Sequence, residues 1–281
     1  MQTARSSGRP LLLPGVYDAL SARLAAAAGF EAIYLTGAGL ANARLGVPDI
    51  GLVSLEQLVD HVAAISDRVD VPLVVDGDTG FGNAVNVTHV VRKLERAGAA
   101  AIQLEDQVFP KKCGHFAGKA IVPAGEMVGK LRAAVDSRRS EGTLIIARTD
   151  ARAIDGIDAA VDRAGQFLAA GADIIFVEAP TSVDELREIA RQIDAPLVAN
   201  MVEGGSTPIV PLDELGQLGY SVVLYANAAL RSAQYAVSRA YAELRVSGIS
   251  TNLLDTMATW EERQSAVGKP EYDELEARYA S

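Results

Sequence analysis

The stretch AGADIIFVE, residues 170–178, holds the pattern that decides the fold. An amphipathic segment ends at Gly171, a residue type that suits the left-handed turn at the end of a helix. A continuous apolar run at residues 174–177 follows, and the charged Glu178 stands directly after it. Continuous apolar runs of this length are typical of parallel strands that are covered on both faces. The stretch therefore predicts a helix-to-strand connection of an α/β protein with an acid at the strand end.

The same order of segments repeats along the chain. The tripeptide Ala-Gly-Ala at 170–172 also occurs at 97–99, again just before an apolar run. Eight apolar runs predict strands at residues 11–13, 32–35, 73–75, 101–104, 144–147, 174–177, 197–199 and 221–224. Segments with apolar residues three and four positions apart predict helices at 19–28, 55–69, 87–97, 126–138, 157–169, 183–193 and 212–218. Further glycines that suit helix ends stand at Gly29, Gly98 and Gly219.

Eight strand–helix repeats predict a (β/α)8 TIM barrel. A doubly wound open sheet is the alternative, but it usually has fewer strands and a G-x-G-x-x-G turn after the first strand, which this chain lacks. No linker rich in Ser, Gly or Pro divides the chain, so we expect one domain over residues 1–281. A long helix at 228–246 precedes residues 249–281, which predict a polar C-terminal helical extension that packs on a neighbouring subunit.

The composition excludes several classes of partner. Lys and Arg total 26 and Asp and Glu total 36, which gives a net charge of −10. Nucleic acids and anionic membranes reward a basic surface, so neither is expected as a partner, whereas a small anion can still bind a local cation. No apolar run approaches the ~20 residues that span a bilayer. One cysteine excludes an intrachain disulfide and fits a cytoplasmic protein.

Charged residues stand at the predicted strand ends, where TIM barrels carry their active sites. Asp76 and Asp78 follow the third strand and Glu105 follows the fourth, and Asp49 and Glu178 are further candidates. Carboxylates are the hard oxygen ligands that suit Mg²⁺, with Mn²⁺ as a second choice. The alternative for any one of these acids is a helix cap or a solvated side chain.

Arg148 follows the fifth strand among these acids. Its guanidinium has the planar shape that binds a substrate carboxylate through two hydrogen bonds. The alternative is a salt bridge between Arg148 and one of the strand-end acids.

The single cysteine, Cys113, lies in the motif KKCGH at 111–115, within a connection after the fourth strand that is long for a βα loop. A lone cysteine is usually a small buried hydrophobe. The lysines and the histidine around this one favour a thiol of lowered pKa, and hence a catalytic role. Zinc is not expected, because the chain offers no second cysteine and no closely spaced histidine pair.

Four motifs resemble the isocitrate lyase / phosphoenolpyruvate mutase superfamily. They are DGDTG at 76–80, EDQ at 105–107, KKCGH at 111–115 and ARTD at 147–150. The resemblance runs in order from about residue 13 to residue 248, and KKCGH is similar to the lyase branch, because the mutases, phosphonopyruvate hydrolases and oxaloacetate decarboxylases lack this cysteine. It implies a homotetramer (a dimer of dimers) of (β/α)8 barrels that exchange their last helix.

The resemblance also implies roles for individual residues. Mg²⁺ would be held near Asp76, with Asp49, Asp78 and Glu105 acting partly through water. The carboxylate of a 2-oxo acid would lie against the backbone amides of Thr36, Gly37 and Ala38. The remaining substrate contacts implied are Arg148, Tyr34 near the reacting oxygen, Gly114 and His115 at the second carboxylate, and Glu178, Asn200 and Glu203 on the far side of the pocket.

The reaction that the resemblance implies is cleavage of a 2-hydroxydicarboxylate into a 2-oxo acid such as pyruvate and a carboxylic acid. Cys113 would protonate the departing carbanion. The segment NMVEGG at 200–205 is more similar to 2,3-dimethylmalate lyases and oxaloacetate hydrolases than to 2-methylisocitrate lyases. A substrate like 2,3-dimethylmalate is therefore preferred. A 2-methylisocitrate lyase (pyruvate and succinate), an oxaloacetate acetylhydrolase and a non-catalytic barrel that binds a 2-oxo acid remain alternatives.

Overall fold

Eight parallel strands pair in sequence order and close into a barrel in the structure, a computed structural model that describes residues 9–112, 114 and 118–280. The strands are β1 Leu11–Val16, β2 Ile33–Leu35, β3 Leu73–Asp76, β4 Ala99–Glu105, β5 Leu144–Thr149, β6 Ile174–Val177, β7 Leu197–Asn200 and β8 Val222–Tyr225. The barrel closes where Leu11 of β1 pairs with Val222 of β8. The predicted (β/α)8 barrel is confirmed.

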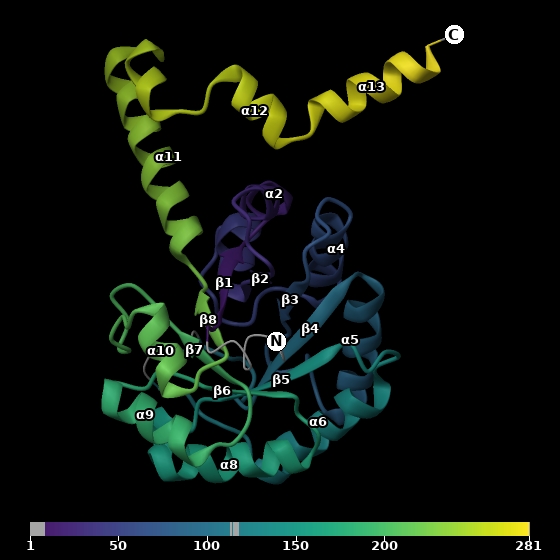
Figure 1. Cartoon of the computed structure of the whole chain (residues 1–281), viewed down its shortest axis with the longest axis vertical. Coiled ribbons are helices and arrows are strands. Elements are labelled where there is room, and N and C mark those ends of the chain that lie inside the picture. The colour runs from purple at the N-terminus through teal and green to yellow at the C-terminus, as the bar shows by residue number, and fades with distance from the viewer. Residues whose placement is uncertain (1–8, 113, 115–117, 281) are drawn as a thin grey trace.

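Helices follow the strands; those between β1 and β8 surround the barrel, and the others extend the chain after β8 (Figure 1). They are α2 Ala19–Ala27, α3 Gly37–Leu40, the π-helix η1 Ala41–Leu45, α4 Leu55–Ser66, α5 Ala84–Arg96, α6 Ala124–Ser137, α7 Arg152–Asp155, α8 Ile157–Ala169, α9 Val183–Gln192, α10 Leu212–Leu218, α11 Ala228–Ser247, the 3-10 helix η2 Thr251–Thr256, α12 Trp260–Ala266 and α13 Lys269–Tyr279. All four predicted helix-end glycines have a positive φ. At Gly171 φ is 99°, a value that strains any residue with a Cβ.

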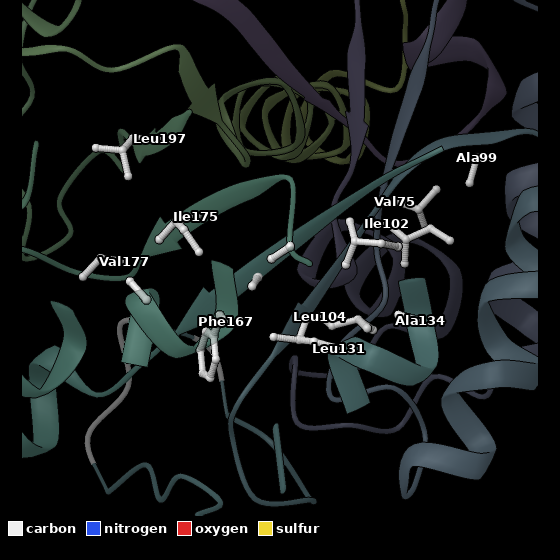
Figure 2. Packing of buried hydrophobic residues seen from close by; sticks show 14 of the residues in the cluster. Val75, Ala99, Ile102, Leu104, Leu131, Ala134, Phe167, Ile175, Val177 and Leu197 are labelled. Atoms are coloured by element: carbon white, nitrogen blue, oxygen red, sulfur yellow. The ribbon is translucent and has the colours of Figure 1, made fainter. Parts of the chain in front are cut away.

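Two apolar layers hold the barrel together, and β6 belongs to both. Ile174 and Phe176 join a cluster inside the barrel, whereas Ile175 and Val177 join the layer between strands and helices. Figure 2 shows part of this outer layer, with Phe167 of α8 near the two β6 side chains. Phe167 is fully buried, and burial of such a side chain stabilises the fold by about 1.5–3 kcal/mol. Both faces of β6 are covered, which explains its unbroken apolar sequence.

Six strands extend further toward the carboxyl end than predicted. The predicted runs stopped at the last apolar residue, but Asp76 still pairs with Gln103, Glu105 with Arg148, and Asn200 with its neighbour on β8. Ladder hydrogen bonds use only backbone groups, so a polar side chain does not end a strand. The polar residues at the mouth are thus held by the sheet itself.

Helix α11 leaves the barrel instead of packing on it (Figure 1). None of its twenty residues is buried. The predicted C-terminal extension, residues 249–281, contains η2, α12 and α13, of which the two α-helices have no buried residue. Within the described residues, no helix combines the length and the apolar character that a membrane span requires.

Candidate active site

The carboxyl ends of the strands meet at one pocket. Asp76 and Glu105 end β3 and β4, Arg148 lies beside Glu105 in β5, and Asn200 ends β7. Parallel strands of a barrel end at the same rim, so these side chains face one mouth. The predicted site residues that line the pocket there are Tyr34, Thr36, Ala38, Asp49, Asp76, Glu105, Gly114, Arg148, Glu178 and Asn200.

Of the remaining predicted residues that the structure describes, Gly37 and Asp78 hydrogen-bond to Asp76, whereas Glu203 lies elsewhere. Glu203 lines a separate hollow beside α11, with Oε2 3.7 Å from the guanidinium of Arg231, so the structure does not bring it to the mouth. The segment that follows β7 carries Glu203 toward α11 and away from the barrel axis, which the strand-end pattern did not anticipate. Cys113 and His115 lie outside the described residues.

The backbone amides after β2 are partly engaged within the protein. The amide of Thr36 donates to the carbonyl of Val16, and the amide of Gly37 donates to Asp76 Oδ2 at 3.2 Å. Gly37 thereby orients the central carboxylate. Substrate binding by the amides of Thr36, Gly37 and Ala38 stays a prediction.

Asp76 is held from several sides. Besides Gly37, the amide of Asp78 donates to Oδ1 at 3.2 Å, and Gln103 Nε2 donates to the same oxygen at 3.4 Å. A Cβ on Gly37 would come within 2.9 Å of Asp76 Oδ2, so only glycine permits this close approach. The carboxylate of Asp76 is therefore fixed before any ligand arrives.

Lys111 stands between two of the acids. Its ammonium lies 2.5 Å from Asp49 Oδ1 and 2.9 Å from Asp78 Oδ1, and its side chain is 3% exposed. Burial alone would lower the pKa of Lys111, but Asp78 and the surrounding carboxylates raise it above its ordinary value. Burial raises the pKa of Asp78 to about 6, although Lys111 opposes the shift. The loop after β4 thus carries a permanent cation into the acidic mouth.

Arg148 is embedded among carboxylates, as the salt-bridge alternative predicted. Its Nε and Nη2 donate to Asp150 at 3.0 and 3.2 Å, and Nη1 lies 3.3 Å from Glu178 Oε2. The guanidinium also stands 5.2 Å from the ring centroid of Phe176, a cation–π contact. Burial alone would lower the pKa of Arg148, but Asp150, Glu178 and Glu105 raise it. The cation is both paired and part of the pocket wall.

Tyr34 and Gln103 form a short buried chain that leads to the central acid. The hydroxyl of Tyr34 donates to Gln103 Oε1 at 3.1 Å, and the other end of that amide reaches Asp76. Burial raises the pKa of Tyr34 well above its usual range, and the charge of Asp76 adds to the rise. Tyr34 is therefore a neutral phenol at neutral pH.

The residues at the mouth suit a divalent metal. Among the described residues, six carboxylates, those of Asp49, Asp76, Asp78, Glu105, Asp150 and Glu178, face four cations, those of Lys111, Lys112, Lys119 and Arg148. Glu105 Oε1 is buried without a hydrogen-bond partner, and burial raises the pKa of this carboxyl well above its usual range. A cation close to Glu105 would give Oε1 a partner and would lower the pKa of this carboxyl.

The described acids do not form a compact cage of three or more ligands. The carboxylates that are present would still suit Mg²⁺, which keeps several waters and takes few direct protein ligands. Asp76, as the most firmly oriented acid, is the direct ligand that fits, with Asp49, Asp78 and Glu105 around it.

The residues of this region that the sequence analysis missed as site residues include Gln103, Lys111, Lys119 and Asp150. Gln103 is the one polar side chain inside a buried apolar strand, and that contrast is a signal that sequence reading could have used. The two lysines belong to a polar loop, in which nothing local tells a buried lysine from a solvated one. Their neighbours are acids from distant strands.

Comparisons with known proteins find a matching family profile and similar sequences. The sequence profile of the phosphoenolpyruvate phosphomutase family matches residues 2–245. The chain is 43% identical to the 2,3-dimethylmalate lyase of Eubacterium barkeri over 281 residues, which cover 100% of this chain and 97% of that protein. It is 46% identical to the 2-methylisocitrate lyase of Aeropyrum pernix over 267 residues, 95% of this chain and 86% of that protein.

Solved structures are similar over the whole chain. A crystal structure of 2,3-dimethylmalate lyase superposes with a TM-score of 0.93 at 35% identity and covers 100% of this chain and 94% of that one. A phosphonopyruvate hydrolase in complex with oxalate and Mg²⁺ superposes with a TM-score of 0.89 at 32% identity, covering 100% and 98%.

Proposed function

The chain belongs to the phosphoenolpyruvate phosphomutase family, and on that premise we propose that it is a carbon–carbon lyase that cleaves a substituted 2-hydroxydicarboxylate. The products would be a 2-oxo acid such as pyruvate and a carboxylic acid. The observation that carries the proposal is the mouth itself, where the buried Arg148 stands beside a group of oriented carboxylates around Asp76. Such a pocket can bind an anionic substrate and a divalent metal side by side.

The metal proposed is Mg²⁺, with Mn²⁺ as a substitute, and the residues that fit it are Asp76, Asp49, Asp78 and Glu105. When bound, it would supply Lewis-acid stabilisation of the negative charge that develops on the substrate oxygen.

The side chains of the chain would perform the rest of the reaction. Arg148 binds a substrate carboxylate, and the neutral phenol of Tyr34 turns its single O–H from Gln103 Oε1 toward the reacting oxygen. The substrate hydroxyl loses its proton, the bond between C2 and C3 breaks, and its electron pair stays on C3. The thiol of Cys113 gives its proton to C3, and the hydroxyl proton, lost to water, is replaced from water on the Cys113 thiolate, so that the proton count is unchanged.

The substrate preferred is one with a small alkyl substituent, such as 2,3-dimethylmalate. On the far side of the pocket the described lining consists of Asn200, Val202, Leu224, Ala226 and Asn227, none of which carries a positive charge. A third carboxylate, as in 2-methylisocitrate, would need a cation there. The described cations that line the pocket are Arg148 of β5 and Lys111 and Lys112 of the loop after β4.

A substrate panel tests the proposal. Release of a 2-oxo acid is measured with 2,3-dimethylmalate, 2-methylisocitrate, isocitrate, citramalate and oxaloacetate, with Mg²⁺ and with a chelator. We expect the highest kcat/KM with 2,3-dimethylmalate and no release after chelation. Preferred cleavage of 2-methylisocitrate would reassign the substrate, and oxalate formed from oxaloacetate would identify a hydrolase. Tight oxalate binding with no turnover of any compound would identify a non-catalytic barrel and refute the proposal.

The assembly proposed is a homotetramer that exchanges C-terminal helices. In a complete (β/α)8 ring an eighth helix covers β8 and β1. Here α11 leaves, and an apolar groove lined by Leu12, Val16, Leu24 and Ala229 stays open. Helix α11 and its extension expose further apolar side chains, among them Tyr241, Val246, Trp260 and Tyr279.

A second copy of the chain fits this groove, because it offers an apolar helix that likewise lacks a partner. Light scattering coupled to gel filtration should give the mass of a tetramer, and Leu24→Glu should lower that mass. A monomer for the unaltered protein would contradict this assembly. The proposal also places the enzyme in the cytoplasm, where a free cysteine stays reduced.

A further inference from the structure

The backbone before position 113 is held by a side chain that the catalytic mechanism above does not use. Gln107 Nε2 donates to the carbonyl of Lys112 at 2.8 Å, and Gln107 Oε1 accepts from the amide of the same residue at 2.9 Å. Gln107 is 1% exposed, so water does not compete for these bonds. Two antiparallel hydrogen bonds to one residue fix both the position and the orientation of its peptide groups.

The backbone after position 113 is held by a second unused side chain. Lys119 Nζ donates to the carbonyl of Gly114 at 2.6 Å and pairs with Asp150 Oδ1 at 2.6 Å. The side chains of Lys119 and Asp150 are 3% and 0% exposed. Asp150 also accepts from Arg148 through two nitrogens, so one carboxylate ties the loop to the arginine of the pocket.

The negative charge of Asp150 stabilises its contacts with both Lys119 and Arg148. Burial opposes ionisation, but Arg148 and Lys119 lower the pKa of Asp150, so both cations keep a carboxylate partner. Gly114 itself packs against the arginine, because a Cβ there would lie 2.4 Å from Arg148 Nη2. The carbonyl that Lys119 holds thus belongs to a residue already at the pocket wall.

Stability alone does not account for this arrangement. A buried lysine loses its hydration, and a buried ion pair is often no more stable than an apolar replacement. A catalytic group, in contrast, gains from exact placement, since an error of about 1 Å can cost about 10²-fold in rate. The two clamps, from Gln107 and Lys119, hold the two residues that flank Cys113 in the sequence.

We propose that Gln107 and Lys119 are positioning residues for the acid–base group at Cys113, with Asp150 coupling Lys119 to Arg148. This inference rests on the proposed function, in which Cys113 protonates the departing carbon. Neither side chain needs to touch the substrate. Each acts through the backbone that it holds.

The first test separates kcat from KM with the best substrate of the panel. In Gln107→Met and in Lys119→Met we expect kcat to fall about 10²-fold with KM changed less than about threefold, because the acid is displaced while Arg148 still binds substrate. Lys119→Arg, which keeps a cation for Gly114 and Asp150, should restore kcat to within about fivefold of the unaltered enzyme.

The matched control is Arg138→Met. Arg138 also binds one backbone carbonyl, that of Thr143 at 2.9 Å, and one carboxylate, that of Asp173 at 2.7 Å. It does so at the opposite rim, before β5 and β6, so its loss should lower the melting temperature but leave kcat unchanged. If Lys119→Met and Arg138→Met change kcat equally, or if kcat stays within about twofold in both clamp variants, the inference is wrong.

A second readout does not depend on turnover. Trypsin cleavage at the bond between Lys112 and Cys113, followed by mass spectrometry under native conditions, reports how firmly this backbone is held. We expect cleavage at least about fivefold faster in Gln107→Met and Lys119→Met and unchanged in Arg138→Met. Faster cleavage together with no turnover of any substrate by the unaltered protein would support the two clamps and overturn the proposed function. Unchanged cleavage in both clamp variants would overturn the clamps.

Discussion

A methyl group added at Gly114 should disable the enzyme while leaving its fold intact. A Cβ at this position would lie 2.4 Å from Arg148 Nη2 and 2.8 Å from Glu178 Cδ. Ordinary contacts of this kind are about 3.5 Å, so something must move by roughly 1 Å. The guanidinium of Arg148 cannot move without losing ion pairs, because Asp150, Glu105 and Glu178 hold it and its side chain is 9% exposed. The backbone at 114 must move instead.

A shift of this size next to the proposed acid should lower kcat of Gly114→Ala about 10²-fold. The assay is steady-state release of the 2-oxo acid, with circular dichroism and thermal melting on the same samples. Gly129→Ala is the matched control, because the added Cβ would meet nothing within 4 Å beyond the neighbouring backbone of its own helix, and the residue is in the middle of α6. That variant should keep its activity and gain about 0.5–1 kcal/mol of stability. Activity of Gly114→Ala within about threefold of the unaltered enzyme would refute the reasoning.

Three further predictions concern the same region. Cys113→Ser should abolish turnover with an unchanged circular dichroism spectrum, and full activity would remove Cys113 from the mechanism. Asp150→Asn leaves Arg148 and Lys119 without their buried carboxylate, so it should cost about 3 kcal/mol or more and lower the melting temperature by roughly 10 °C, measured by calorimetry. The raised pKa of Asp78, about 6, means that the folded, metal-free protein holds a proton that the unfolded chain has lost above about pH 4. Stability should therefore decline as pH rises from about 4 to 6, and Asp78→Asn should reduce that decline in melting curves; equal slopes would contradict the shift.

The sequence was sufficient for the fold because its signals are local. Most strands are short apolar runs, such as the fully covered β6, and glycines such as Gly171 end the helices before the strands begin. Repeated eight times, this pattern favours a closed barrel over an open sheet. The predicted strands ended too early, because Asp76 and Glu105 still pair in the ladder. Backbone pairing depends on the neighbouring strand and not on the side chain.

The candidate site, too, was predicted correctly only in part. The acids at strand ends and Arg148 were predicted, because the carboxyl ends of parallel strands always share one rim. Glu203 was expected in the pocket and is instead beside Arg231, because an irregular loop direction has no periodic signal. The position of Glu203 depends on where the chain turns after β7.

What the sequence by itself determined is the barrel, the acidic rim and the motif around Cys113. What only the tertiary structure decided is which side chains complete that rim. Lys111 pairs with Asp49 and Asp78, and Lys119 with Asp150, across separations of 31 to 62 residues in the chain. Such pairings arise when strands that are distant in sequence end at one mouth, where low solvent exposure makes each uncompensated charge costly and brings cation and carboxylate together.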